Sequence, residues 1–86
     1  MKVHVPTPLH DYTDQRAVVE ADGATLREVL EDLDARHPGM RFRVVDEQGE
    51  IRTHIKMFVN AREVSGLAVR LEPDDEVHII AALSGG

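Results

Sequence analysis

The fold class is decided by residues 22–39, which read DGATLREVLEDLDARHPG. Thr25 is a favourable helix N-cap residue, and Glu28 three positions later completes a capping box. The apolar residues that follow recur at helical spacing and form one stripe with charged residues opposite: Leu26, Val29, Leu30 and Leu33. Residues 37–39 (His-Pro-Gly) end the helix, because proline disfavours helical geometry before it and glycine accepts a left-handed turn. The sequence therefore predicts one amphipathic helix.

Short segments on both sides of this helix alternate polar and apolar residues, which is the period of half-buried β-strands. They are residues 2–5, 15–21, 54–59, 62–64 and 76–81. Residues 9–14 read as a polar turn, residues 40–52 as a short helical turn followed by a loop, and residues 67–71 as a connection that fills the core.

One helix covers only one face of a sheet, so we predict an α+β fold with four to five strands in a mixed sheet and the helix on one face. The element order is that of the β-grasp (ubiquitin-like) roll. In that roll the first and last strands lie parallel at the centre of the sheet. We expect one domain over residues 1–82 and a flexible C-terminal tail over residues 83–86.

Composition and charge exclude several classes of function. The chain has 86 residues, with 16 acidic against 10 basic residues and a formal net charge of −6, which repels phosphate backbones and argues against a nucleic-acid partner. The absence of cysteine excludes disulfides, thiolate nucleophiles and cysteine metal sites. No apolar stretch is long enough to span a bilayer, and the first residues lack a signal-peptide pattern. We therefore expect a cytoplasmic protein without a membrane partner.

The last residues, Ala82-Leu83-Ser84-Gly85-Gly86, follow the final predicted strand directly. A terminal carboxylate is a poor electrophile until its oxygen becomes a leaving group, for example by adenylation in the nucleotide pocket of another protein. Glycine has no Cβ and has wide backbone freedom, so Gly85 and Gly86 suit a narrow channel. We expect Gly86 to carry the reacting group, with Leu83, Ser84 and Gly85 threaded into a partner.

Four segments together carry a resemblance to a known family: Gly23–Leu30, Phe58–Asn60 with Val64, Leu71–Ile80, and Ala82–Gly86. Through them the sequence resembles the ThiS/MoaD family of ubiquitin-like sulfur carriers over nearly its whole length, and MoaD-like or CysO-like members most of all. Two residues depart from the family pattern. Asp75 stands where the family often has glycine, and Ala81 where it often has proline.

The resemblance implies a carrier protein, or the small subunit of a synthase complex, and not an enzyme. An adenylating enzyme of the ubiquitin-activating type would join Gly86 to AMP, using ATP and magnesium. A sulfur donor of the desulfurase or rhodanese type would then convert Gly86 to a thiocarboxylate, and a downstream synthase would accept the sulfur. The carrier itself would bind no cofactor.

The predicted sheet places four side chains on the face away from the helix: His4, His78, Ile80 and Phe58. They form a candidate docking patch, because partner proteins bury exposed aromatic and aliphatic side chains, although single exposed apolar residues are also ordinary. His4 and His78 are expected to approach each other across parallel strands. Zinc usually takes three or four ligands and the spacing shows no third, so no metal site is predicted.

Two chemistries share the activation of Gly86. One is sulfur carriage, and the alternative is a ubiquitin-like modifier that forms isopeptide bonds with lysines of target proteins. A third possibility is an interaction module whose tail has no chemistry. Acceptors as different as molybdopterin, cysteine, thiamin, thiolated RNA and secondary metabolites are all compatible with the first.

Overall fold

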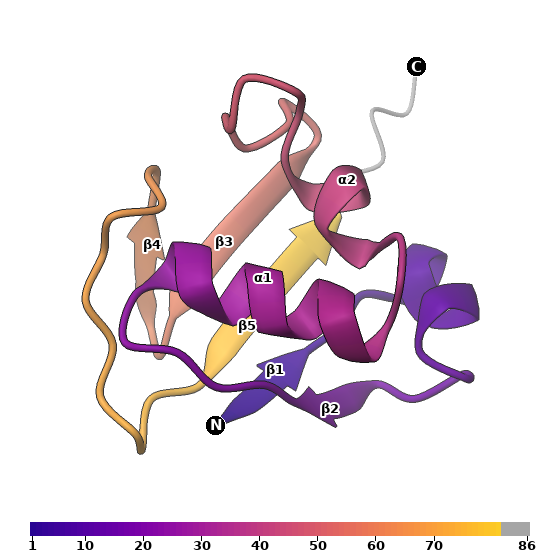
Figure 1. The fold of residues 1–86 in the computed structure, drawn as a ribbon, viewed down its shortest axis with the longest axis horizontal. Helices are drawn as coiled ribbons and strands as arrows, with labels where there is room; N and C mark the ends of the chain where they lie inside the picture. The colour runs from indigo at the N-terminus through magenta and orange to yellow at the C-terminus, as the bar shows by residue number, and fades with distance from the viewer. Residues whose placement is uncertain (82–86) are drawn as a thin grey trace.

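A computed structural model describes residues 1–81 of the chain (Figure 1). Its elements in chain order are β1 (Lys2–His4), the 3₁₀ helix η1 (Thr7–Tyr12), β2 (Val18–Glu20), α1 (Leu26–Arg36), α2 (Met40–Val44), β3 (Ile55–Val59), β4 (Arg62–Val64) and β5 (Val77–Ala81). The strands form a five-stranded sheet in the order β2-β1-β5-β3-β4. β1 and β5 are parallel neighbours at its centre, whereas the other pairs are antiparallel, as predicted.

The N-terminus of α1 is capped by Thr25 and Glu28 as the sequence predicts, and the loop after β4 adds further hydrogen-bond acceptors. The Thr25 hydroxyl accepts the Glu28 backbone N–H at 3.3 Å, and the Glu28 carboxylate accepts the Ala24 N–H at 2.9 Å. The loop after β4 supplies two further acceptors, since the carbonyls of Val69 and Leu67 accept the N–H groups of Leu26 and Arg27. The first backbone donors of a helix have no intrahelical partner, so these bonds set where α1 begins.

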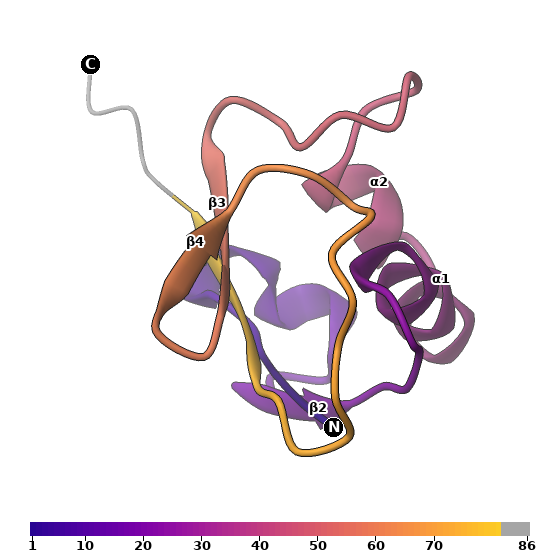
Figure 2. The same ribbon diagram turned by 90° about the vertical axis from the view of Figure 1, so that its left-hand side faces the viewer.

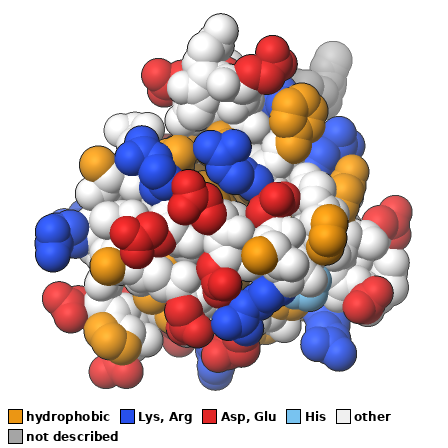
Figure 3. Space-filling view, viewed as in Figure 1, with side chains coloured by type: hydrophobic (Ala, Val, Ile, Leu, Met, Phe, Trp, Pro, Cys, Tyr) orange, Lys and Arg blue, Asp and Glu red, His pale blue; other side chains and the backbone are white. Residues whose placement is uncertain are grey.

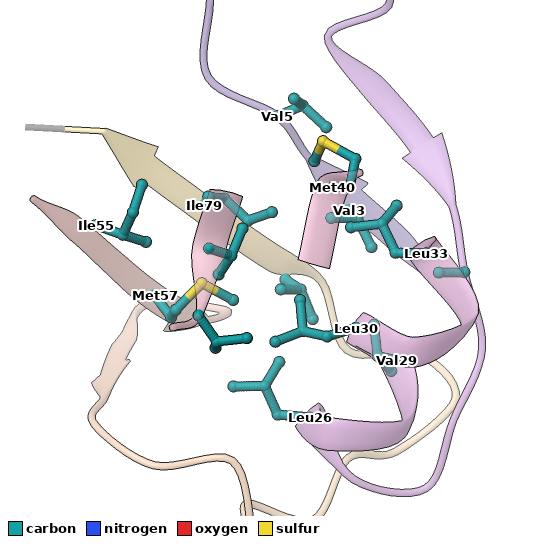
Figure 4. Close-up of a cluster of buried hydrophobic side chains, with 14 of the residues drawn as sticks. Val3, Val5, Leu26, Val29, Leu30, Leu33, Met40, Ile55, Met57 and Ile79 are labelled. Atoms are coloured by element: carbon teal, nitrogen blue, oxygen red, sulfur yellow. The ribbon is translucent and has the colours of Figure 1, made fainter. Parts of the chain in front are cut away.

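The core lies between the sheet and α1, which packs across one face of the sheet (Figures 2 and 4). The predicted stripe of α1 is fully buried, with Leu26, Val29, Leu30 and Leu33 each at 0% exposure. The inward side chains of the central strands face it: Val3 from β1, Met57 from β3, and Val77 and Ile79 from β5. Because successive side chains of a strand point to opposite faces, the residues between these buried ones lie on the face of the sheet away from α1.

Two segments differ from their predictions. A polar turn was predicted over residues 9–14, but residues 7–12 form η1, and Leu9 within it is buried. The reason is tertiary, because Leu9 packs into the same core as the sheet. In the loop after β4, Leu67 and Leu71 enter the core as predicted, but Val69 is only partly buried.

The short helical turn predicted after residue 39 is α2, which buries Met40 and Val44. Gly39 precedes it with φ +99°, a backbone conformation that glycine adopts at low cost. Within residues 1–81, no helix has the length and apolar character needed to cross a membrane.

Candidate functional site

The pairing register lines up one side chain from every strand across the sheet. Val18 of β2 pairs with His4 of β1, and His4 pairs with His78 of β5. His78 pairs with Phe58 of β3, which pairs with Glu63 of β4. We call these five residues the outer row. Their neighbours Val19, Val3, Val77 and Val59 are buried in the core, so the outer row lies on the face away from α1.

The candidate docking patch falls on this face as the sequence predicts. His4, His78 and Phe58 belong to the outer row, and Ile80 lies two residues beyond His78 on the same side of β5. Ile80 is 45% exposed, and Phe58 is half-buried. Val18, at 43% exposure, extends the apolar surface to β2, although it was not among the predicted patch residues. Whether this surface docks a partner stays a prediction.

The face that carries α1 has a different character. Acidic and basic side chains of both signs are spread over it (Figure 3). Several of them pair with one another, since Arg36 contacts Asp32 at 2.9 Å and Asp22 at 3.4 Å. Apolar side chains also lie on the helix side of the molecule, since Phe42 of α2 is 54% exposed, but the outer row is the better candidate for a protein contact because it is continuous with Ile80 near the end of β5.

His4, His78 and Glu76 form a compact polar cluster in the middle of the face of the sheet that points away from α1. We call this face the outer face. The His4 Nε2 atom lies 2.6 Å from Glu76 Oε1, and the rings of His4 and His78 stack at 4.2 Å between centroids. The hydrogen bond from His4 holds the pKa of the Glu76 carboxyl below its usual value of 4.5, assisted by the charges of His4, Lys2 and His78. Glu76 is therefore a carboxylate at neutral pH.

This cluster corrects one step of the sequence analysis. The expectation of no metal site rested on the lack of a third ligand beside His4 and His78, and Glu76 supplies that third group. A signal for it was present in the sequence. Glu76 precedes His78 by two residues, and residues two apart on a strand share a face.

Asn60 and Asp75 fix the turn that precedes β5 through hydrogen bonds. Asn60, at φ +55°, accepts the Glu76 N–H on its side-chain oxygen at 3.0 Å and donates its own N–H to the Glu76 carbonyl at 2.8 Å. Its amide also donates to Asp75, whose other carboxylate oxygen accepts the Glu72 N–H. These two bonds, that of Glu72 first, hold the pKa of Asp75 below its usual value of 3.8. Asp75, which stands where the family often has glycine, therefore caps the turn before β5 with its carboxylate.

The described chain ends at Ala81, which pairs with Ile55 at the end of β5. A cleft of about 320 Å³ adjoins Ala81, lined by side chains from η1, α2 and the start of β3. Arg52 lies in its wall, 4.6 Å above the Phe42 ring, and donates to the Phe42 carbonyl. No pattern in the sequence predicted this cleft. The predicted tail residues Leu83, Ser84, Gly85 and Gly86 lie outside the described residues.

Comparison with known proteins assigns the family. The family model described as "ThiS family" matches residues 3–86. The chain belongs to the ThiS family. This ThiS-family chain is 34% identical over 89 residues to the sulfur carrier protein CysO of Mycobacterium tuberculosis, covering 98% of this chain and 96% of CysO. It is 35% identical over 68 residues to small archaeal modifier protein 3 of Haloferax volcanii, covering 76% and 73%.

Among solved structures, the ThiS-family chain is similar to a chain of the Amycolatopsis orientalis BexX/CysO complex. The two superpose with a TM-score of 0.91 and 34% identity, over 99% of this chain and 98% of the other. This likeness confirms the predicted β-grasp fold. The relatives are named as carrier and modifier proteins, which supports the prediction that this ThiS-family chain is not a catalyst.

Proposed function

We propose that this protein is a sulfur carrier that holds sulfur as a thiocarboxylate at Gly86. The observation that carries the proposal is the match to a named sulfur carrier over nearly the full length of both chains. The family match also runs to residue 86 and so includes the terminal glycine pair. A sequence without cysteine has no thiol to hold sulfur, which leaves the carboxylate as the natural attachment point.

In the proposed cycle, the Gly86 carboxylate attacks the α-phosphorus of ATP in an adenylating enzyme of the ubiquitin-activating type, and pyrophosphate leaves. Magnesium in that enzyme offsets the phosphate charge. The terminal sulfur of a persulfide on the sulfur donor then displaces AMP and forms an acyl disulfide. A second thiol attacks the donor's sulfur, which leaves a disulfide on the donor and releases the thiocarboxylate. A downstream synthase accepts that sulfur.

The outer face is the proposed docking surface for the adenylating enzyme. Phe58 and Ile80 are suited to be buried by a partner, and Ile80 lies next to Ala81, from which residues 82–86 continue. The similarity to a chain from a two-protein complex supports a partner-bound working state. We further propose a cytoplasmic location, because adenylation needs a compartment that supplies ATP.

Intact-mass spectrometry of the chain isolated from its native cell tests the proposal. We expect a fraction whose mass has increased by the difference between sulfur and oxygen, with the change located at Gly86 by fragmentation. The same fraction should be absent from a chain that lacks Gly86. If the mass never changes, or changes equally in the shortened chain, sulfur carriage at Gly86 is wrong.

Charge substitution tests the docking surface separately. Phe58→Asp and Ile80→Asp should each lower the kcat/KM of adenylation at least about fivefold, the size expected for a contact that matters in an interface. Ala35→Asp is the matched control, since it adds the same charge on the exposed side of α1. Equal kinetics for all three variants would remove the outer face from the proposal without affecting the chemistry at Gly86.

Protein modification through Gly86 is the second candidate, favoured by the identity to a small archaeal modifier protein over most of both chains. It shares the adenylation step and differs in the nucleophile, which would be a lysine amine of a target protein. Proteomic detection of lysines that carry the C-terminal residues of this chain would support it. Thiocarboxylate without such adducts would support sulfur carriage.

A further inference from the structure

We propose that His4, Glu76 and His78 form a binding site for a divalent transition-metal ion of the zinc class. The site lies at the centre of the outer face and uses neither the tail nor the chemistry at Gly86. Two imidazoles and one carboxylate are a donor set that zinc accepts in proteins, with water in the remaining position. Imidazole donors favour zinc and neighbouring transition metals over magnesium and calcium, which prefer oxygen ligands.

The three donor atoms already lie close together. One ligand atom from each residue lies within 4.8 Å of the other two. Ligands in a tetrahedral zinc site lie roughly 3.4 Å apart, given bond lengths of about 2.0–2.1 Å. The longest separation therefore has to close by no more than about 1.4 Å. All three side chains are partly exposed, so rotation about their side-chain bonds can bring them together without moving the core.

The contact between His4 and Glu76 marks where the ion belongs. At 2.6 Å, His4 Nε2 and Glu76 Oε1 are joined by one hydrogen bond, and each atom is a Lewis base that can bind a metal ion. A metal ion placed between them is bound by both atoms through their lone pairs when the His4 ring is neutral with its single proton on Nδ1. His78, stacked on His4, contributes the third donor from the neighbouring strand.

The backbone beneath the cluster is held from both sides. β1 and β5 pair directly through His4 and His78, which sets the separation of the two rings. Glu76 is fixed by its two hydrogen bonds with Asn60, one at its N–H and one at its carbonyl. Ligands on a rigid support bind metal with less loss of conformational freedom, so this arrangement favours binding.

Titration of the untagged, metal-free full chain with zinc chloride, followed by calorimetry, tests the site. We expect binding at one ion per chain. His4→Ala and His78→Ala should each weaken zinc binding at least about tenfold. Removal of a group that supports a ligand already lowers metal affinity by about this factor, and removal of the ligand itself should lower it at least as much. Glu76→Gln should also weaken it. His54→Ala is the matched control, because His54 is exposed and lies away from the cluster, and its affinity should equal that of the wild type.

A second measurement needs no variant. Zinc should shift the ring ¹⁵N resonances of His4 and His78 in the wild-type chain and leave those of His54 unchanged. Cobalt(II) should bind at the same stoichiometry with visible absorption bands that zinc displaces. The proposal is overturned if no ion binds, if His78→Ala binds as tightly as the wild type, or if His54→Ala loses affinity equally. The trio would then be a hydrogen-bonded surface network only.

Discussion

At Gly23 the chain passes against the first turn of α1 with no space for a side chain. A Cβ there would lie 2.6 Å from the Val29 nitrogen and 2.8 Å from the Glu28 carbonyl carbon, both of them backbone atoms of the helix. Gly23→Ala should therefore lower the free energy of unfolding by about 1–3 kcal/mol, the usual cost of overpacking. Urea unfolding measures it, with Gly66→Ala as the control.

The control isolates the steric effect. A Cβ at Gly66 meets no atom within 4 Å, so its substitution should change stability by less than about 0.5 kcal/mol. If the two variants unfold at the same urea concentration, the close approach at Gly23 does not limit the side chain.

Asp75 links the stability of the turn before β5 to pH. Its pKa is lowered in the folded chain by the Glu72 N–H and the Asn60 amide, so its ionised form stabilises the fold. That contribution is present above the usual value of 3.8 and is lost as the pH falls through the lower, folded value. Asp75→Asn should thus lose less stability than the wild type on acidification from neutral pH to below the usual value.

Urea unfolding midpoints at neutral and acidic pH give the comparison. Asp74→Asn is the matched variant, since Asp74 is the exposed neighbour in the same turn, and it should keep the wild-type acid sensitivity. An Asp75→Asn chain with unchanged acid sensitivity would contradict the assignment.

Among the elements, α1 depends on groups outside itself for its first turn. Thr25 caps one backbone N–H, and the carbonyls of Leu67 and Val69 take two more. Thr25→Ala removes the side-chain acceptor of the Glu28 N–H and should cost about 1 kcal/mol of unfolding free energy. Thermal unfolding followed by circular dichroism measures it. Thr53→Ala, at an exposed turn position, should be nearly neutral, and an equal loss would argue against the capping role.

For the whole molecule, stability depends on one core between α1 and the sheet. Leu30 is fully buried there, and Leu30→Ala should cost about 2–5 kcal/mol through lost burial and the cavity left behind. A domain of this size has a total of roughly 4–13 kcal/mol, so the variant should unfold at a far lower urea concentration. Val18→Ala, at 43% exposure on an edge strand, should cost less than about 1 kcal/mol. Comparable losses in both would be inconsistent with a single core.

Local patterns were sufficient for much of the fold and part of the site. The cap at Thr25 and the His-Pro-Gly stop bounded α1, because caps and breakers act within a few residues. The alternation of side chains along β3 and β5 predicted that Phe58, His78 and Ile80 lie on the same face of the sheet, because successive side chains point to opposite sides. The family resemblance carried by the motifs was confirmed by the match over residues 3–86.

Tertiary structure alone decided the register and everything that depends on it. His4 meets Glu76 across 72 residues of sequence, and only the parallel pairing of β1 with β5 brings them to 2.6 Å. The burial of Leu9 likewise required the core to form first. Alternation within a strand says which face a side chain takes, whereas the partner it meets there is set by pairing with distant segments. The sequence by itself therefore determined the elements and their faces, and the assembled sheet decided which side chains stand together.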